Sequence, residues 1–237
     1  MDISKVRAGQ SEGAIAYRYS SPAIPSKTLY LNLIARYACT NDCVFCSRPR
    51  GEAERDKPNI YEAEAGTSLY LSKSPTIEEV MSAIASNIKS EDKEIAFVGP
   101  GEPLLYLPTV VGVIRGIKAD YHIRTRMDTN GSVRHIYPDA ARQLAEAGLD
   151  EIRISVNAIN KMEYNVMCRP SSKAAYASML SFLKECVAEG INTKASFISG
   201  FNHPGLECRT DTEYIRFAES LGLGEENVVL RKFIPPI

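Results

Sequence analysis

The 237-residue sequence lacks an apolar run that could cross a bilayer, for which about 20 consecutive apolar residues are needed. The segment from Met1 to Gln10 is polar and has no signal-peptide core. The chain also lacks a basic excess, since its net charge is -1, whereas domains that grip a nucleic-acid backbone are usually basic. No phosphate loop ending in Gly-Lys-Ser/Thr is present. These absences predict a cytoplasmic protein without a membrane partner.

Histidine is scarce, and its distribution argues against a paired zinc site. His122, His135 and His203 show no metal-ligand spacing, whereas structural zinc sites usually combine Cys-x-x-Cys with a second pair elsewhere. There are six cysteines, and in a reducing compartment clustered thiols indicate metal ligands or catalytic groups rather than disulfides. Three of them fall within residues 39–46, and the scattered others form no second cluster motif: Cys168, Cys186 and Cys208.

The remaining pattern alternates short strands with amphipathic helices. Thr76 and Glu79 have the spacing of a capping box, and Gly148 is placed to end a helix that Pro138 begins. Further helices are expected over 108–118, around 179–190 and around 214–222, and strands over 28–34, 94–98, 121–127, 151–156, 192–198 and 227–233. Such alternation predicts an α/β fold, a partial (β/α)6 TIM-like barrel with a mainly parallel six-stranded sheet. We expect a single domain over 1–237, with a polar lead-in over 1–26 and an irregular insertion over 48–74.

The strongest functional signal is the run Cys39-Thr-Asn-Asp-Cys43-Val-Phe-Cys46, directly after the first predicted strand. Iron–sulfur clusters are held by thiolates in such short runs. Three local thiolates leave one iron of a [4Fe–4S] cluster without a protein ligand, and an open position is where metal centres do chemistry. Two alternatives stay open at this point, namely a zinc-bearing binding module and an iron–sulfur protein that only transfers electrons or senses redox state.

The triplet, with Phe45 before its last cysteine, resembles the signature of the radical S-adenosylmethionine (radical SAM) superfamily. The resemblance implies a [4Fe–4S] cluster whose open iron chelates S-adenosylmethionine. It implies reductive cleavage of that molecule to a 5′-deoxyadenosyl radical, which takes a hydrogen atom from a substrate. Leu-Tyr-Leu-Asn-Leu before the cluster and Cys-Arg-Pro at 168–170 resemble the TatD-nuclease-associated subgroup, and the core is similar to wyosine-type synthases.

Motifs after later strands extend the resemblance. Gly99-Pro100-Gly101-Glu102-Pro103 is similar to the family's Gly-Gly-Glu-Pro stretch, with Pro100 in place of the first glycine of that triplet. The resemblance implies that this stretch contacts the methionine amino group, where acceptors suit an ammonium. Further S-adenosylmethionine contacts are implied for Asn130, Ser155 and Asn157.

Several cations complete the sequence-based expectations. Arg153 and Lys194 alternate with apolar residues in their strands, which aims them into the barrel interior. An anionic substrate or the methionine carboxylate would bind to arginines near strand ends or in flanking loops, with Arg153 as the first candidate among Arg36, Arg48, Arg124, Arg126, Arg153 and Arg169. The resemblance also implies a small electron donor of the flavodoxin or ferredoxin type. The substrate expected is a small molecule or a tRNA.

Overall fold

The computed structural model describes residues 13–19, 27–49 and 68–233. Most of the predicted lead-in and of the predicted insertion therefore lies outside the described residues. Within these ranges no helix is long and apolar enough to span a membrane.

One sheet organises the molecule, and its strands follow one another in space in chain order. Strand β1 pairs antiparallel with β2, and every later pairing is parallel. The strands are β1 (Ala16–Tyr17), β2 (Thr28–Leu31), β3 (Glu94–Phe97), β4 (Arg124–Thr129), β5 (Glu151–Ser155), β6 (Asn192–Ser199) and β7 (Val228–Lys232). The sheet is open, with β1 and β7 at its edges, which confirms the partial barrel.

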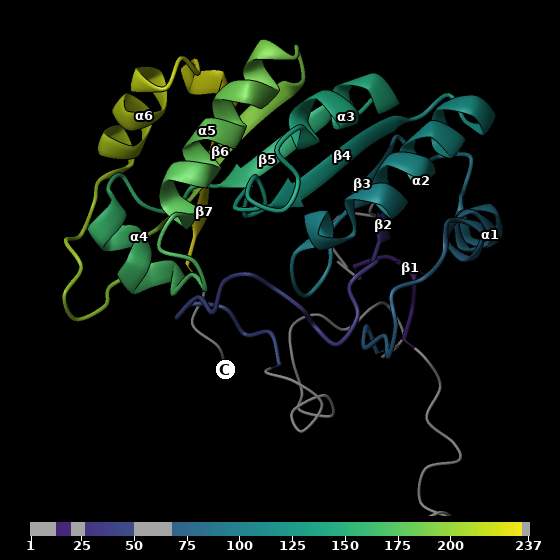
Figure 1. Cartoon of the computed structure of the whole chain (residues 1–237), viewed down its shortest axis with the longest axis horizontal. Helices are drawn as coiled ribbons and strands as arrows, with labels where there is room; N and C mark the ends of the chain where they lie inside the picture. The colour runs from purple at the N-terminus through teal and green to yellow at the C-terminus, as the bar shows by residue number, and fades with distance from the viewer. Residues whose placement is uncertain (1–12, 20–26, 50–67, 234–237) are drawn as a thin grey trace, which may run out of the picture.

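Among the described residues, six α-helices and two short 3-10 helices connect the strands. They are α1 (Ile77–Asn87), η4 (Pro103–Tyr106), α2 (Leu107–Asp120), α3 (Ala140–Ala147), α4 (Lys161–Cys168), α5 (Ala175–Ala188), α6 (Asp211–Ser220) and η5 (Glu225–Asn227). Figure 1 shows α1, α2, α3, α5 and α6 over one face of the sheet. This arrangement leaves the other face of the sheet to carry polar side chains.

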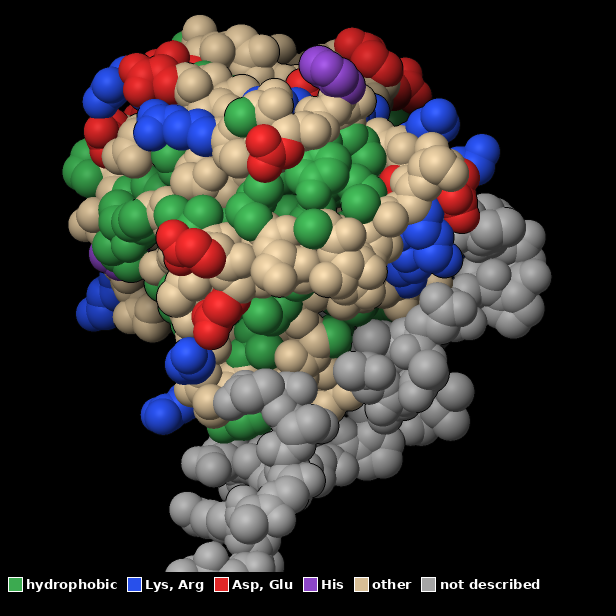
Figure 2. Space-filling model, turned by 90° about the vertical axis from the view of Figure 1, so that its right-hand side faces the viewer, with side chains coloured by type: hydrophobic (Ala, Val, Ile, Leu, Met, Phe, Trp, Pro, Cys, Tyr) green, Lys and Arg blue, Asp and Glu red, His purple; other side chains and the backbone are tan. Residues whose placement is uncertain are grey.

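The core lies between the sheet and those helices. Alternate strand residues point into it, so that Ile95, Phe97, Met127, Ile152 and Ile154 are fully buried. Figure 2, which views the molecule from the side that lies to the right in Figure 1, shows acidic, basic and hydrophobic side chains interspersed over the outer surface.

The structure adds two elements that the pattern did not reveal. Residues 1–26 were expected to be only a lead-in, yet Ala16–Tyr17 adds a seventh, antiparallel strand. Two residues are too few for an alternating pattern to be visible. Helix α4, with four of its eight residues buried, lies in the connection after β5 and was not expected.

Candidate functional site

The cysteine loop folds back across the carboxyl ends of the strands and docks on α4. Its backbone makes the contacts, because the N–H of Asp42 donates to the carbonyl of Cys168 at 3.0 Å and that of Val44 donates to Met167 at 2.8 Å. Arg36 has a positive φ of 51°, which turns the chain into the loop after β2. The loop is therefore shaped by main-chain hydrogen bonds to α4.

The three cysteine side chains of the loop are half-buried. Burial raises the pKa of the Cys39 thiol to about 12, and that sulfur accepts from the N–H of Asn41 at 3.4 Å and faces the amide of Asn130 at 3.6 Å. A hydrogen bond with Cys168, followed by burial, holds the pKa of the Cys43 thiol well above its usual value. Metal binding favours the thiolate, so these groups would lose their protons to a bound cluster.

The geometry of the thiols does not match a single-ion site. Within 13–19, 27–49 and 68–233, no three Cys, His, Asp or Glu side chains are close enough to share one metal ion. A cluster does not need such convergence, because each thiolate binds a different iron. Cys168 is fully buried in the core and does not belong to the cavity described next, so it lies behind Cys43.

A cavity of about 190 Å³ opens beside the loop at the carboxyl ends of the strands. In open parallel sheets ligands bind at this end. The cavity brings together the residues that the sequence predicted, with the exception of Pro100, which is buried outside its wall. Its predicted members are Cys39, Cys43, Phe45, Cys46, Gly99, Gly101, Glu102, Asn130, Ser155 and Asn157.

The turn after β3 touches the cysteine loop directly. Gly101 has a φ of 151°, and a Cβ at that position would lie 2.3 Å from the carbonyl oxygen of Ala38. The N–H of Glu102 donates to the same carbonyl at 2.9 Å. Only glycine allows the two segments to approach this closely.

The carboxylate of Glu102 is buried and accepts hydrogen bonds from other residues of the protein. It is 1% exposed and accepts from the hydroxyl of Thr129 at 2.6 Å, the N–H of Asn130 at 2.7 Å and the N–H of Leu104 at 3.0 Å. Burial raises its pKa to about 6, although each of these three hydrogen bonds acts in the opposite direction and lowers the pKa. The side chain thus ties the turn after β3 to the end of β4.

Two buried acceptors at the cavity have no partner. Among the described residues, the side-chain oxygens of Asn41 and Asn157 are buried and accept no hydrogen bond. Asn157 follows β5 with a positive φ of 60°, and its amide nitrogen faces the sulfur of Cys168 at 3.8 Å. Such acceptors suit the ammonium or hydroxyl groups of a ligand, so the residues present fit a cluster with S-adenosylmethionine beside it.

The sequence did not single out every residue of the wall. Asn41 was overlooked although it stands inside the cysteine run, because an amide between metal ligands carries no spacing signal of its own. Arg231 of β7 was also missed, and only its alternation on a terminal strand could have indicated it. Arg48, Val98, Asp128 and Thr129 complete the lining.

Comparison with known proteins places this site in context. A probable GTP 3′,8-cyclase from Saccharolobus islandicus is 24% identical over 200 residues, which cover 84% of this chain and 56% of the cyclase. The chain thus spans about half the length of such curated relatives.

Solved structures share the fold. A structure of TYW1 with a lysine-pyruvate adduct matches 88% of this chain and 65% of its own with a TM-score of 0.56 and 16% identity. The hydrogenase maturase HydG from Carboxydothermus hydrogenoformans matches 88% of this chain and 44% of its own with a TM-score of 0.60 and 17% identity. The expected likeness to wyosine-type synthase cores thus holds at the level of the fold, while the TatD-associated subgroup stays a prediction.

The radical SAM family model matches residues 34–219, from the loop before the first cysteine to the end of α6. Its members are enzymes with a [4Fe–4S] cluster and S-adenosylmethionine as cofactors. The chain belongs to the radical SAM superfamily.

Proposed function

We propose that Cys39, Cys43 and Cys46 ligate a [4Fe–4S] cluster and that the cavity beside them binds S-adenosylmethionine. Bound there and reduced, the cluster would supply the electron for cleavage of S-adenosylmethionine to a 5′-deoxyadenosyl radical, which would abstract hydrogen from the substrate. The observation that carries the proposal is the cavity lined by three loop thiols and by Asn41 and Asn157, whose side-chain oxygens are buried without a partner among the described residues.

The residues around the thiols have distinct roles in this proposal. The amide oxygens of Asn41 and Asn157 would accept from the ammonium or the ribose hydroxyls of S-adenosylmethionine. The Glu102 carboxylate, already occupied, would act by holding the turn 99–102 and the N–H of Asn130 in place. Phe45 packs edge-on against Phe201 with ring centroids 5.8 Å apart, which would shield the cluster from solvent.

A direct test measures 5′-deoxyadenosine formed from S-adenosylmethionine by the reconstituted, dithionite-reduced protein. We expect the wild type to form it and Cys43→Ala to lose both the cluster absorbance and the product. Cys208→Ala is the matched control, because that cysteine is exposed and away from the cavity. Equal product from Cys43→Ala and the wild type would overturn the ligand assignment.

The buried Cys168 provides a second arm of the same test. If the cluster leaves one iron open, Cys168→Ala will keep both the cluster and the product, since three thiolates suffice. Loss of the cluster in Cys168→Ala would indicate four protein ligands and an electron-transfer role instead.

The partners follow from the chemistry proposed. A small electron donor of the flavodoxin or ferredoxin type would reduce the cluster, and the substrate would be a small molecule or a tRNA. The cytoplasm is the expected location, because reduced clusters and free thiols persist in a reducing compartment.

A further inference from the structure

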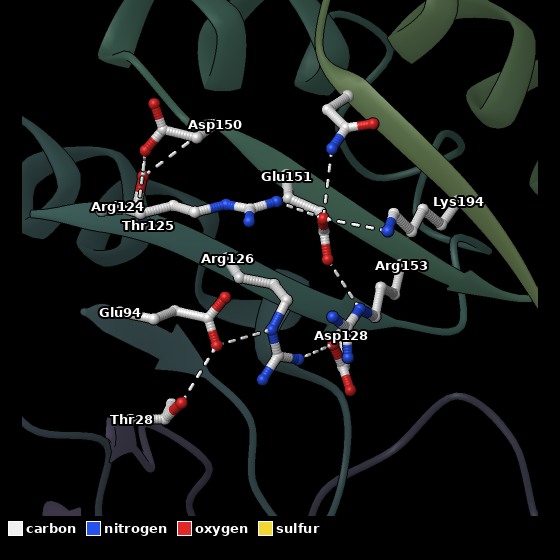
Figure 3. Close-up of polar contacts among 11 residues, drawn as sticks. Thr28, Glu94, Arg124, Thr125, Arg126, Asp128, Asp150, Glu151, Arg153 and Lys194 are labelled. Carbon is white, nitrogen blue, oxygen red and sulfur yellow. Dashed lines mark hydrogen bonds and ion pairs between the residues drawn. The ribbon is translucent and has the colours of Figure 1, made fainter. Parts of the chain in front are cut away.

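Charged side chains cover the inner face of the sheet, opposite the helices (Figure 3). Ile152 and Ile154 point into the core, so Glu151 and Arg153 project from the other face of β5. Arg153 stands beside Lys194 of β6 in the register, and the sequence predicted that both side chains are aimed away from the apolar core. The balance of cations and carboxylates on this face determines the sign of the ligand that it attracts.

Around Glu151 the cations outnumber the carboxylates. This carboxylate is 1% exposed and forms ion pairs with Arg124, with Arg153 at 2.7 Å and with Lys194 at 3.5 Å. The side chains of Arg153 and Lys194 stay 33% and 24% exposed. Three cations therefore pair with a single buried carboxylate. Because the cations are more exposed than Glu151, a ligand that approaches this face contacts the cations first.

The neighbouring ion pairs offset only part of this excess. Arg126 lies between Glu94, at 3.0 Å, and Asp128. With the group around Glu151, four cations face three carboxylates on β3 to β6. The face is thus positively charged even before β7 is considered.

Arg231 of β7 adds a further cation next to the cavity. Its guanidinium donates to the hydroxyls of Ser155 at 3.2 Å and Ser196 at 3.1 Å. No carboxylate of the described residues pairs with it, although it lines the same cavity as the cysteines. A guanidinium held by neutral hydroxyls keeps its charge and most of its N–H donors available.

We propose that Arg231, with Lys194 and Arg153 one row deeper, binds an anionic group of the substrate, a phosphate or a carboxylate. The proposal rests on the function proposed above, because Arg231 lines the same cavity as the three thiols. Arg231 is exposed, so a ligand can reach it, and the fork of arginine matches a phosphate or a carboxylate.

The anionic group that binds Arg231 has two candidate sources, the substrate and the carboxylate of S-adenosylmethionine. Titration calorimetry on the cluster-loaded full chain separates them, with inorganic pyrophosphate as the anion probe, with and without saturating S-adenosylmethionine. We expect pyrophosphate to bind in both conditions. We expect Arg231→Gln and Lys194→Gln each to weaken it about tenfold, the value of one charge-assisted hydrogen bond, while the S-adenosylmethionine Kd stays within about threefold.

Lys232→Gln is the matched control, because Lys232 follows Arg231 on β7, projects from the opposite face and is exposed. It should leave pyrophosphate binding unchanged. Wild-type protein that fails to bind pyrophosphate would overturn the proposal. So would displacement of pyrophosphate by S-adenosylmethionine together with a tenfold weaker cofactor affinity in Arg231→Gln. The titration without cofactor tests the anion site even if the chain formed no 5′-deoxyadenosine.

Discussion

The buried Glu102 carboxylate should make the stability of the protein fall as pH rises. Its pKa is raised from 4.5 to about 6, mainly by burial. Below pH 4.5 the group is protonated in both the folded and the unfolded state, and the fold carries no penalty. As pH rises through 6, the folded state must ionise a carboxyl group that is 1% exposed, and stability is lost.

The size of this loss follows from the pKa change. A tenfold change in an equilibrium is worth about 1.4 kcal/mol, so the rise to about 6 corresponds to about 2 kcal/mol. Glu102→Gln cannot ionise and should lack this loss. The variant also places an amide against the N–H of Asn130, which adds a pH-independent cost of about 1–3 kcal/mol.

The assay is urea unfolding of the metal-free protein under reductant from pH 4 to 7.5, for wild type and Glu102→Gln. Other titrating groups cancel in the difference between the two free energies of unfolding. That difference should move by about 2 kcal/mol in favour of the variant as pH rises. Thr129→Val removes one donor to the carboxylate and should shift the window to higher pH. A difference that is flat with pH, or that moves towards the wild type, would refute the reasoning.

The remaining predictions concern the loop and two structural contacts. Gly101→Ala should lower stability by about 1–3 kcal/mol and reduce the iron bound per chain after reconstitution, because its Cβ would collide with Ala38; unchanged iron content would contradict this. Asp92→Ala removes the two-point partner of Arg18, which keeps its hydrogen bonds to the carbonyls of Thr28 and Asn87, and should cost about 1–3 kcal/mol in urea unfolding; a loss below about 0.5 kcal/mol would show that the pair is not needed. Thr76→Ala should cost about 1 kcal/mol through the lost cap of α1, whereas Thr76→Ser should cost little; equal losses in the two would argue against the cap.

Local signals in the sequence predicted much of the fold. Both hydrogen bonds of the capping box between Thr76 and Glu79 are present, and Gly148 ends α3 with its backbone in the left-handed region. The strand expected over 121–127 begins at Arg124, because Tyr121 caps the preceding helix α2. Such boundaries depend on where a helix ends, which periodicity alone does not reveal.

Contacts between distant segments explain what the sequence did not show. Helix α4 is held partly by hydrogen bonds from the cysteine loop, more than 100 residues earlier in the chain, and such a distant contact leaves no signal in the local pattern. The rule that ligands gather at the carboxyl ends of parallel strands did collect the candidate residues at one cavity. The direction of the Glu102 carboxylate was not predictable, because its partners Thr129 and Asn130 belong to another strand end.

The docking of the cysteine loop on α4 has a consequence for how the protein is made. Zinc fingers are unfolded without metal because their ligands are ordered only by the ion. Here Asp42 and Val44 already anchor the loop through main-chain hydrogen bonds. Part of the chain entropy of the loop is therefore lost when these hydrogen bonds form during folding, so cluster insertion should require less ordering of the chain than metal binding by a zinc finger.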